Sequence, residues 1–174
     1  DVMHHTAEGL VDVDVRIVDM NSNSNNIAIT DQNGHFEFED AKFYRTYSVK
    51  PESNDDVLNG VSTLDLVHIQ RHILDIDAIE IPTNLIAADI NADNKVSAAD
   101  LVALRKVILG ITNEYQNNNS WRFVPSTHEF QDSTYPWGFP EEMVCYIGAH
   151  NLSWEKIQEH ELEETIAVPM AVAT

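Results

Sequence analysis

The stretch Asp89-Ile90-Asn91-Ala92-Asp93-Asn94-Lys95-Val96-Ser97-Ala98-Ala99-Asp100 decides the fold of the central part of the chain. Side chains that carry oxygen stand at every second position from Asp89 to Asp93, and again at Ser97 and Asp100. Calcium takes about six to eight oxygen ligands, and a loop of about twelve residues supplies them from positions 1, 3, 5, 7, 9 and 12. The stretch has this length and this spacing, and it therefore predicts a calcium site.

Each ligand position of the loop holds a suitable residue. Position 7 contributes its backbone carbonyl, so a lysine is acceptable there, and position 9 can act through a water molecule. Position 6 requires a sharp turn that glycine usually provides, and Asn94 is the best substitute because asparagine tolerates a positive φ. The predicted ligands are Asp89, Asn91, Asp93, the carbonyl of Lys95, Ser97 and Asp100.

The unit around this loop occurs twice. Half of the positions from 61 to 76 are identical to those from 96 to 111, and so close a repeat sets the architecture of this region. Each copy is a polar loop followed by a predicted helix with a serine N-cap and an acidic residue three positions later. An apolar stripe at helical spacing lies on both helices: Leu66, Ile69 and Ile73 in the first, Leu101, Leu104 and Ile108 in the second. Pro82 in the connector excludes one continuous helix.

The first loop is a degraded copy of the second. The equivalent positions are Asn54, Asp56, Leu58, Gly60, Ser62 and Asp65. Leu58 removes an oxygen ligand, and Asn54 stands where the second loop has a charged residue. Either Asp55 shifts to compensate and a second ion binds, or the loop is a vestige held by hydrogen bonds. The sequence predicts one Ca²⁺ in the second loop and leaves a second ion open.

Position 12 separates this loop from an EF-hand, which has a bidentate glutamate there, whereas this loop has Asp100. Two loop–helix repeats of this kind, at residues 54–74 and 89–109, resemble a type I dockerin. The resemblance implies an extracellular or cell-surface bacterial protein that binds a cohesin-like module of another protein. It places the contacts at loop positions 10 and 11 and on the helix faces, at Thr63, Leu64, Arg71, His72, Arg105 and Lys106. The pairs Thr63-Leu64 and Ala98-Ala99 depart from the Ser/Thr pair of cellulosomal dockerins.

Residues 1–52 have the pattern of β-structure. Val11, Val13, Val15 and Ile17 alternate with polar residues, and Asp31-Gln32-Asn33-Gly34 is a turn signal. Strands are expected at 27–30, at 35–39 and before Pro51, with a polar loop at 21–26. The segment 29–38, with Tyr47-Ser48-Val49, resembles the carboxypeptidase-regulatory and collagen-adhesin B-type domains. This resemblance implies a non-catalytic prealbumin-like β-sandwich that serves as a spacer.

Residues 113–174 are expected to form a β-rich extension that packs on the preceding modules. Strands are predicted around 121–124 and 144–147, a short helix at 153–164, and an apolar run at 166–172 that pairs with a sheet edge. The expected fold class is therefore α+β. Its expected domains are a small antiparallel sandwich at 1–52, the calcium-binding repeats at 53–112 and the extension at 113–174.

The composition limits the function. A net charge of −19 argues against nucleic acid and anionic membrane surfaces as partners, and it favours cations and basic protein surfaces. No apolar run has the length of a membrane-spanning helix. Cys145 is the single cysteine, so an intrachain disulfide is excluded. A glycine-rich phosphate loop and a serine nucleophile elbow are both missing, and a non-catalytic protein is expected.

The main hypothesis is a docking or adhesion module with structural calcium. One alternative is a subunit of a surface fibre or layer that assembles through its terminal strands, at 1–7 and 166–172. Another is a carbohydrate-binding module that uses Trp121, Trp137 and Trp154. His68 and His72 have the four-residue spacing of a zinc pair on a helix, but without a third ligand they are expected to be exposed surface residues.

Overall fold

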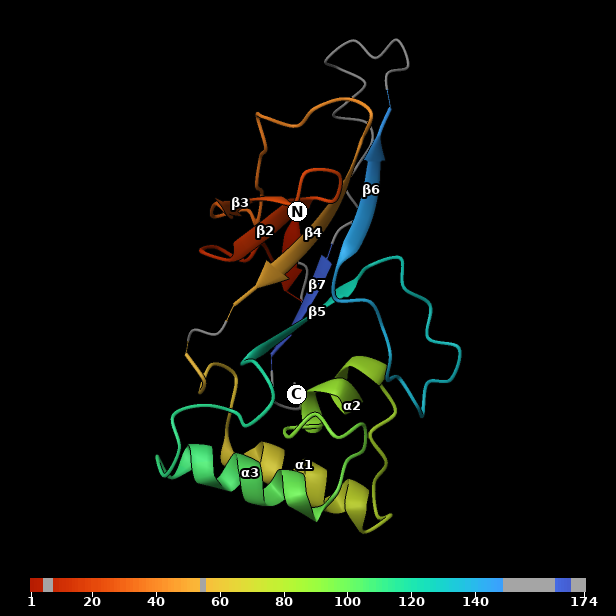
Figure 1. Cartoon of the computed structure of the whole chain (residues 1–174). Coiled ribbons are helices and arrows are strands. Elements are labelled where there is room, and N and C mark those ends of the chain that lie inside the picture. Colours follow the sequence, from red (N-terminus) through yellow and green to blue (C-terminus); the bar gives the residue numbers. More distant parts are fainter. Residues whose placement is uncertain (5–7, 54–55, 149–164, 170–174) are drawn as a thin grey trace. The chain divides into compact units, whose positions relative to one another are not determined.

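The computed structural model describes residues 1–4, 8–53, 56–148 and 165–169, with backbone alone for the last range, and has an α+β fold (Figure 1). It divides into two compact units. Unit 1 comprises residues 1–52, 123–128 and 140–167, and unit 2 comprises residues 53–122, 129–139 and 168–174. Residues 113–174 are thus distributed over both units.

Unit 1 contains a four-stranded antiparallel sheet in the order β3-β2-β4-β6. Its strands are β2 (Asp14–Asp19), β3 (Ser24–Ile29), β4 (Arg45–Glu52) and β6 (Met143–Ile147). Alternating residues of β2 and β4 face the core, where Val15, Ile17 and Val49 are buried. The alternation of valine and isoleucine with polar residues predicted this half-buried strand, because successive strand residues face opposite sides of a sheet.

The boundaries of β2 and β3 differ from the expected ones. The strand predicted from Val11 begins only at Asp14, because Asp12 has a φ of 61° that interrupts the extended backbone. Three residues of the polar stretch predicted as a loop, Ser24 to Asn26, belong to β3 instead. Their pairing with β2, in which Asp19 lies opposite Ser24, outweighs the low strand preference of asparagine.

The strand predicted at 35–39 is absent from the elements of the described chain. The turn that precedes it is present: the Asp31 N–H donates to the His35 carbonyl, and the Asp31 carboxylate accepts from the N–H groups of Asn33 and His35. Phe36 is buried. After the turn, the chain runs beside β3 without a ladder of hydrogen bonds.

Strand β4 continues through Pro51, where the sequence predicted that it would end. Pro51 lies opposite Val15 of β2, and the partner strand β6 pairs with β4 only as far as Val49. The missing N–H of the proline therefore interrupts no hydrogen bond to β6.

A second sheet has the order β1-β7-β5. It consists of β1 (Val2–His4), β5 (Trp121–Pro125) and β7 (Thr165–Pro169). Strand β1 pairs in parallel with β7, and Val2 lies opposite Thr165. This is the pairing expected for the start of the apolar terminal run. The predicted helix at 153–164 and the end of that run lie outside the described residues.

Unit 2 holds the three helices of the described chain. They are α1 (Thr63–Ile73), α2 (Pro82–Ala88) and α3 (Ala98–Ile108), and α1 and α3 lie side by side (Figure 1). Ile69 of α1 and Leu104 of α3 are fully buried in one core with Ile90, which confirms the two apolar stripes. No helix in the described residues is long and apolar enough to cross a membrane.

Pro82 excludes one continuous helix, as predicted, because α1 ends at Ile73 and a separate helix, which the sequence analysis missed, begins at Pro82. Pro82 occupies the first turn of α2. Proline is tolerated there because the first N–H groups of a helix have no intrahelical acceptor. The helix ends at Asp89, which is its C-cap and also the first residue of the second loop.

Candidate metal centre

The second loop is held between two helices. Asp89 follows the last residue of α2, and Asp100 lies in the first turn of α3. Ile90 is fully buried and anchors the start of the loop in the core of unit 2. The two ends of the loop are therefore fixed by packing, and its side chains converge between them.

Three carboxylates gather in this loop. Oxygen atoms of Asp89, Asp93 and Asp100 all lie within 4.8 Å of one another. Asp89 is 1% exposed and Asp100 is 0% exposed, whereas Asp93 lies at the surface. The ammonium of Lys95 lies 3.5 Å from Asp93, and among the described residues no cationic side chain pairs with Asp89 or Asp100. Buried charges in proteins are normally paired or bound to a metal, so this cluster fits a cation.

The backbone of the loop turns as the sequence predicted. Asn94 at position 6 has a φ of 65°, and Ala92 at position 4 has a φ of 57°. These turns bring two N–H groups onto the first ligand: Asp93 N lies 3.0 Å from Asp89 Oδ1, and Asn94 N lies 2.9 Å from Asp89 Oδ2. The bonds orient the Asp89 carboxylate toward the centre of the loop.

Asp100 is fixed by the cap of α3. Its Oδ2 accepts from the N–H of Ser97 at 2.8 Å and from the Ser97 hydroxyl at 3.2 Å, while its Oδ1 accepts from the N–H of Asn91 at 3.2 Å. The predicted N-cap with its acidic partner is therefore confirmed as a capping box. The cap also brings Ser97 and Asn91, two predicted ligands, to the carboxylate.

The electrostatics of the cluster favour a cation. Burial raises the pKa of Asp89, and the negative charges of Asp100 and Asp93 raise it further. The N–H groups of Asn94 and Asp93 oppose the shift, because they stabilise the charged form. Ionising this group without a cation nearby is therefore costly, and a divalent ion among the three carboxylates removes that cost.

The first loop has a different geometry. Position 1, Asn54, lies outside the described residues, and Leu58 at position 5 is 47% exposed. In the described part of the first loop, φ is positive at Asp56 and Gly60. In the second loop φ is positive at Ala92 and Asn94, which correspond to positions 57 and 59 of the first loop. Asp56 Oδ1 accepts from Leu58 N within its own turn. Asp65 is buried and caps α1 through Ser62, the same arrangement as at Asp100.

The segment after α3 contacts both loops, which sequence reasoning missed. The buried Tyr115 donates its hydroxyl to the carbonyl of Val57 at 2.6 Å, and Asn118 donates to the carbonyl of Asp89 at 3.0 Å. Burial raises the pKa of Tyr115 to about 12, and the nearby Asp65 and Asp56 contribute. The isolated Tyr115 and the Asn run at 117–119, directly after the repeat, were the available signal.

Residues 54–109 match the family model of the dockerin type I domain. Dockerin domains bind calcium and dock onto cohesin modules, and they occur in extracellular bacterial proteins. The match therefore supports a calcium-binding, protein-docking module in this part of the chain. Neither a curated protein nor a solved structure matches the chain.

The dockerin segment exposes equivalent stripes on its two outer helices. Thr63, Val67, Arg71 and Leu74 follow one another at helical spacing on α1 and are exposed, and Arg71 pairs with Asp77 at 3.2 Å. The repeat-related residues of α3 are also exposed: Ala98, Val102, Lys106 and Leu109, with Arg105 beside them. Leu64, a further predicted contact on the first helix, is exposed as well. Both stripes combine apolar and basic side chains.

The two histidines of the dockerin segment are not free surface residues as expected. Nε2 of His68 is buried and makes no hydrogen bond to any described residue. His72 is half-buried, and its Nδ1 accepts from the N–H of Ile79 at 3.1 Å. The imidazole of His72 therefore holds the connector that follows α1.

Cys145 and the tryptophans are the other residues that the sequence singled out. Cys145 is half-buried in β6, where burial raises the pKa of its thiol. Trp121 is buried in β5, and Trp137 contacts the exposed Tyr135 edge to face at a ring separation of 6.4 Å. Trp154 lies outside the described residues. The described tryptophans therefore form no shared flat platform.

Proposed function

We propose that this chain is a non-catalytic, extracellular docking module in which calcium stabilises the second loop of the dockerin segment. One observation carries the proposal: two fully buried carboxylates, Asp89 and Asp100, converge with Asp93, and no cationic side chain of the described residues pairs with the buried two. The ion supplies the positive charge that this arrangement requires. Its role is structural because the ligands also cap α3 and end α2.

The ion would be held by the residues that the spacing selects. These are Asp89, Asn91, Asp93, the carbonyl of Lys95, Ser97 and Asp100. The first loop would hold no ion of comparable affinity. Its position 5 is Leu58, and its backbone turns at other positions than the second loop does. We therefore propose one strong calcium site in the described chain.

The partner would be a cohesin-like module that packs on the exposed stripes of α1 and α3. Val67 and Leu74 on α1, with Val102 and Leu109 on α3, offer apolar contacts at equivalent positions. Arg71 and Lys106 stand within these stripes, so a partner surface with carboxylates would complement them. The basic stripes differ in sign from the acidic chain as a whole, which favours this face for recognition of an acidic surface.

Unit 1 would serve as a spacer with a prealbumin-like fold. Its antiparallel sheet β3-β2-β4-β6 buries one face, which supports this role. Assembly through the terminal strands has less support than docking, because β1 and β7 pair with each other within the chain.

The test is binding to a panel of purified cohesin modules, measured by calorimetry with calcium and with EDTA. We expect binding to at least one module in calcium and its loss in EDTA. The matched variants are Val102→Asp, in the stripe of α3, and Val11→Asp, at an exposed position of unit 1. Binding that persists in Val102→Asp and its Val67→Asp counterpart would contradict the assignment of the docking face.

A further inference from the structure

The described strands of the sheet in unit 1 leave two edges, at β3 and at β6, and β3 pairs with β2 alone among them. The N–H of Met20 donates to the carbonyl of Thr46, so the even-numbered residues of β2 direct their backbone groups to β4. The odd-numbered residues of β2 direct their backbone N–H and C=O groups to β3, and their partners there are Ala28, Asn26 and Ser24. The remaining residues of β3, among them Ile27 and Ile29, therefore direct their N–H and C=O groups to the open edge.

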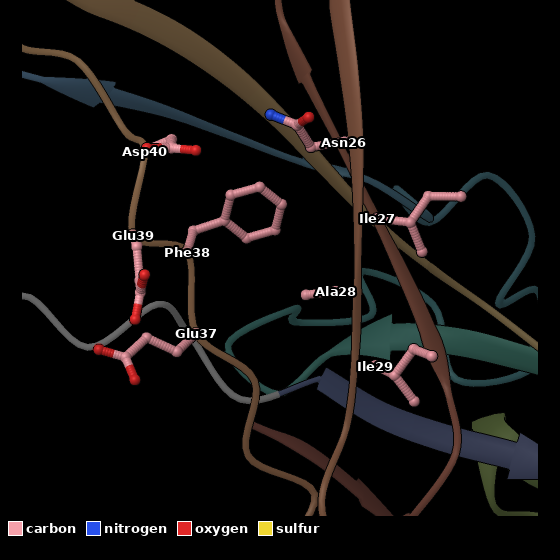
Figure 2. Close-up of a pocket in the computed structure, with 8 residues that line it drawn as sticks. All are labelled: Asn26, Ile27, Ala28, Ile29, Glu37, Phe38, Glu39 and Asp40. Carbon is pink, nitrogen blue, oxygen red and sulfur yellow. The ribbon is translucent and has the colours of Figure 1, made fainter.

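A cleft of about 370 Å³ borders this edge. Figure 2 shows the two walls: Asn26 to Ile29 of β3 on one side and Glu37 to Asp40 on the other, with the ring of Phe38 directed toward β3. The side chains of Ile27 and Ile29 point away from the cleft in this view. They are 57% and 61% exposed. The side chains of Asn26 and Ala28 lie on the cleft side of β3.

The facing segment offers charge without partners. Within the described residues, no hydrogen bond or ion pair engages the carboxylates of Glu37, Glu39 or Asp40. The whole chain carries a net charge of −19, which also attracts a basic partner. By contrast, β3 contains neither proline nor a charged residue, the features by which natural proteins usually block an open edge.

We propose that β3 is a strand-addition site for an extended basic segment of a partner protein. The segment pairs its backbone with the outward N–H and C=O groups of Ile27 and Ile29, and alternate basic side chains reach the carboxylates of residues 37–40. Pairing of this kind takes its affinity from the backbone and its specificity from alternate side chains. A second copy of this chain fits poorly, because it would bring two acidic rims together. The site lies in unit 1 and is independent of the calcium loop.

The probe is a synthetic peptide of about seven residues in which lysine and valine alternate. Its control is the same peptide with every second backbone nitrogen methylated, which keeps the charge and blocks strand pairing. We expect saturable binding of the first peptide by fluorescence anisotropy, with amide NMR shifts centred on Ile27 and Ile29. Binding of the methylated peptide should be weaker by tenfold or more. Equal binding of both peptides, or no binding of either, would overturn the proposal.

Two variants of the protein separate the backbone from the charge. Ile27→Pro removes an outward N–H that β2 does not use, and it should weaken binding about fivefold, which is the value of about one net hydrogen bond. The double variant Glu37→Gln with Glu39→Gln should weaken peptide binding at least as much as Ile27→Pro does. The control is the double variant Asp75→Asn with Glu80→Gln, which removes the same charge in unit 2 and should not weaken binding. Amide spectra of β2 and β4 check that each variant is folded. Equal losses from both acidic pairs, or self-association through β3, would contradict the assignment of a basic partner strand.

Discussion

Replacing Asp100 by asparagine separates its two roles, because one carboxylate both caps α3 and belongs to the cluster of three. Asp65 makes the same contacts to the N-cap serine of α1: its Oδ2 accepts from Ser62 N at 2.6 Å and from the Ser62 hydroxyl at 2.9 Å. Asp65→Asn is therefore the matched control. In EDTA, each substitution should lower the free energy of unfolding by about 1–3 kcal/mol, the range for a weakened cap and its charged hydrogen bonds. The loss at Asp100 should be the smaller one, because repulsion from Asp89 and Asp93 is relieved.

Calcium should then separate the two variants. At a free calcium concentration of about 100 times the Kd, binding adds about 2.7 kcal/mol to the stability of the unsubstituted protein. Asp100→Asn does not gain this stability, so the difference in free energy of unfolding between it and the unsubstituted protein should be larger in calcium than in EDTA by about that amount. For Asp65→Asn the difference should be the same in both conditions. Urea unfolding followed by helical circular dichroism measures this selectively, because the helices of the described chain all lie in unit 2. An Asp100→Asn deficit that is the same in calcium and in EDTA would refute the reasoning.

Three further predictions concern positions outside the cluster. Tyr115→Phe leaves the Val57 carbonyl unpaired and should lower the stability of unit 2 by about 1 kcal/mol. Because the pKa of Tyr115 is raised to about 12, the stability that its hydroxyl provides is present below about pH 10 and is lost as the pH rises toward 12. Thermal melting over this alkaline range should therefore show a loss of stability in the unsubstituted protein that Tyr115→Phe does not show. The pKa of Asp19 is held below its usual value by the Ser22 hydroxyl, the Asn21 N–H and the charge of Arg45. The stability that the Asp19 carboxylate contributes is therefore present above about pH 4 and is lost as the pH falls further. When stability is measured over an acid titration, Asp19→Asn should lose less of it than the unsubstituted protein. Leu104→Ala, at a fully buried position, should cost about 2–5 kcal/mol in urea unfolding, and the exposed Val102→Ala should cost under about 0.5 kcal/mol.

The sequence predicted those parts of the structure that depend on neighbouring residues. Ser97 and Asp100 form the predicted cap, and Asn94 has the predicted left-handed turn, because both depend on interactions within a few positions. The apolar stripes of the two helices were also readable, since helical spacing identifies a buried face. The same local spacing predicts the ligand set of the second loop, of which the structure brings the carboxylates of Asp89, Asp93 and Asp100 together.

The missed features depend on contacts between distant parts of the chain. Strand β4 pairs with β6, so Tyr47 lies opposite Cys145, and no local pattern relates residues so far apart. The contacts of Tyr115 and Asn118 with the two loops were missed for the same reason. At Pro82 the sequence correctly excluded a continuous helix but did not reveal the short helix that begins there, because proline both ends helices and begins them.

A calcium titration by calorimetry, on the intact chain and on Asp89→Ala, tests the central claim most directly. Asp89 is the first predicted ligand of the second loop, and its carboxylate accepts hydrogen bonds from the N–H groups of Asp93 and Asn94. We predict one strong site per chain and its loss in Asp89→Ala, with magnesium unable to replace calcium at the same concentration. Unchanged calcium binding by Asp89→Ala, or no binding by the intact chain, would contradict the assignment of a calcium centre to this loop.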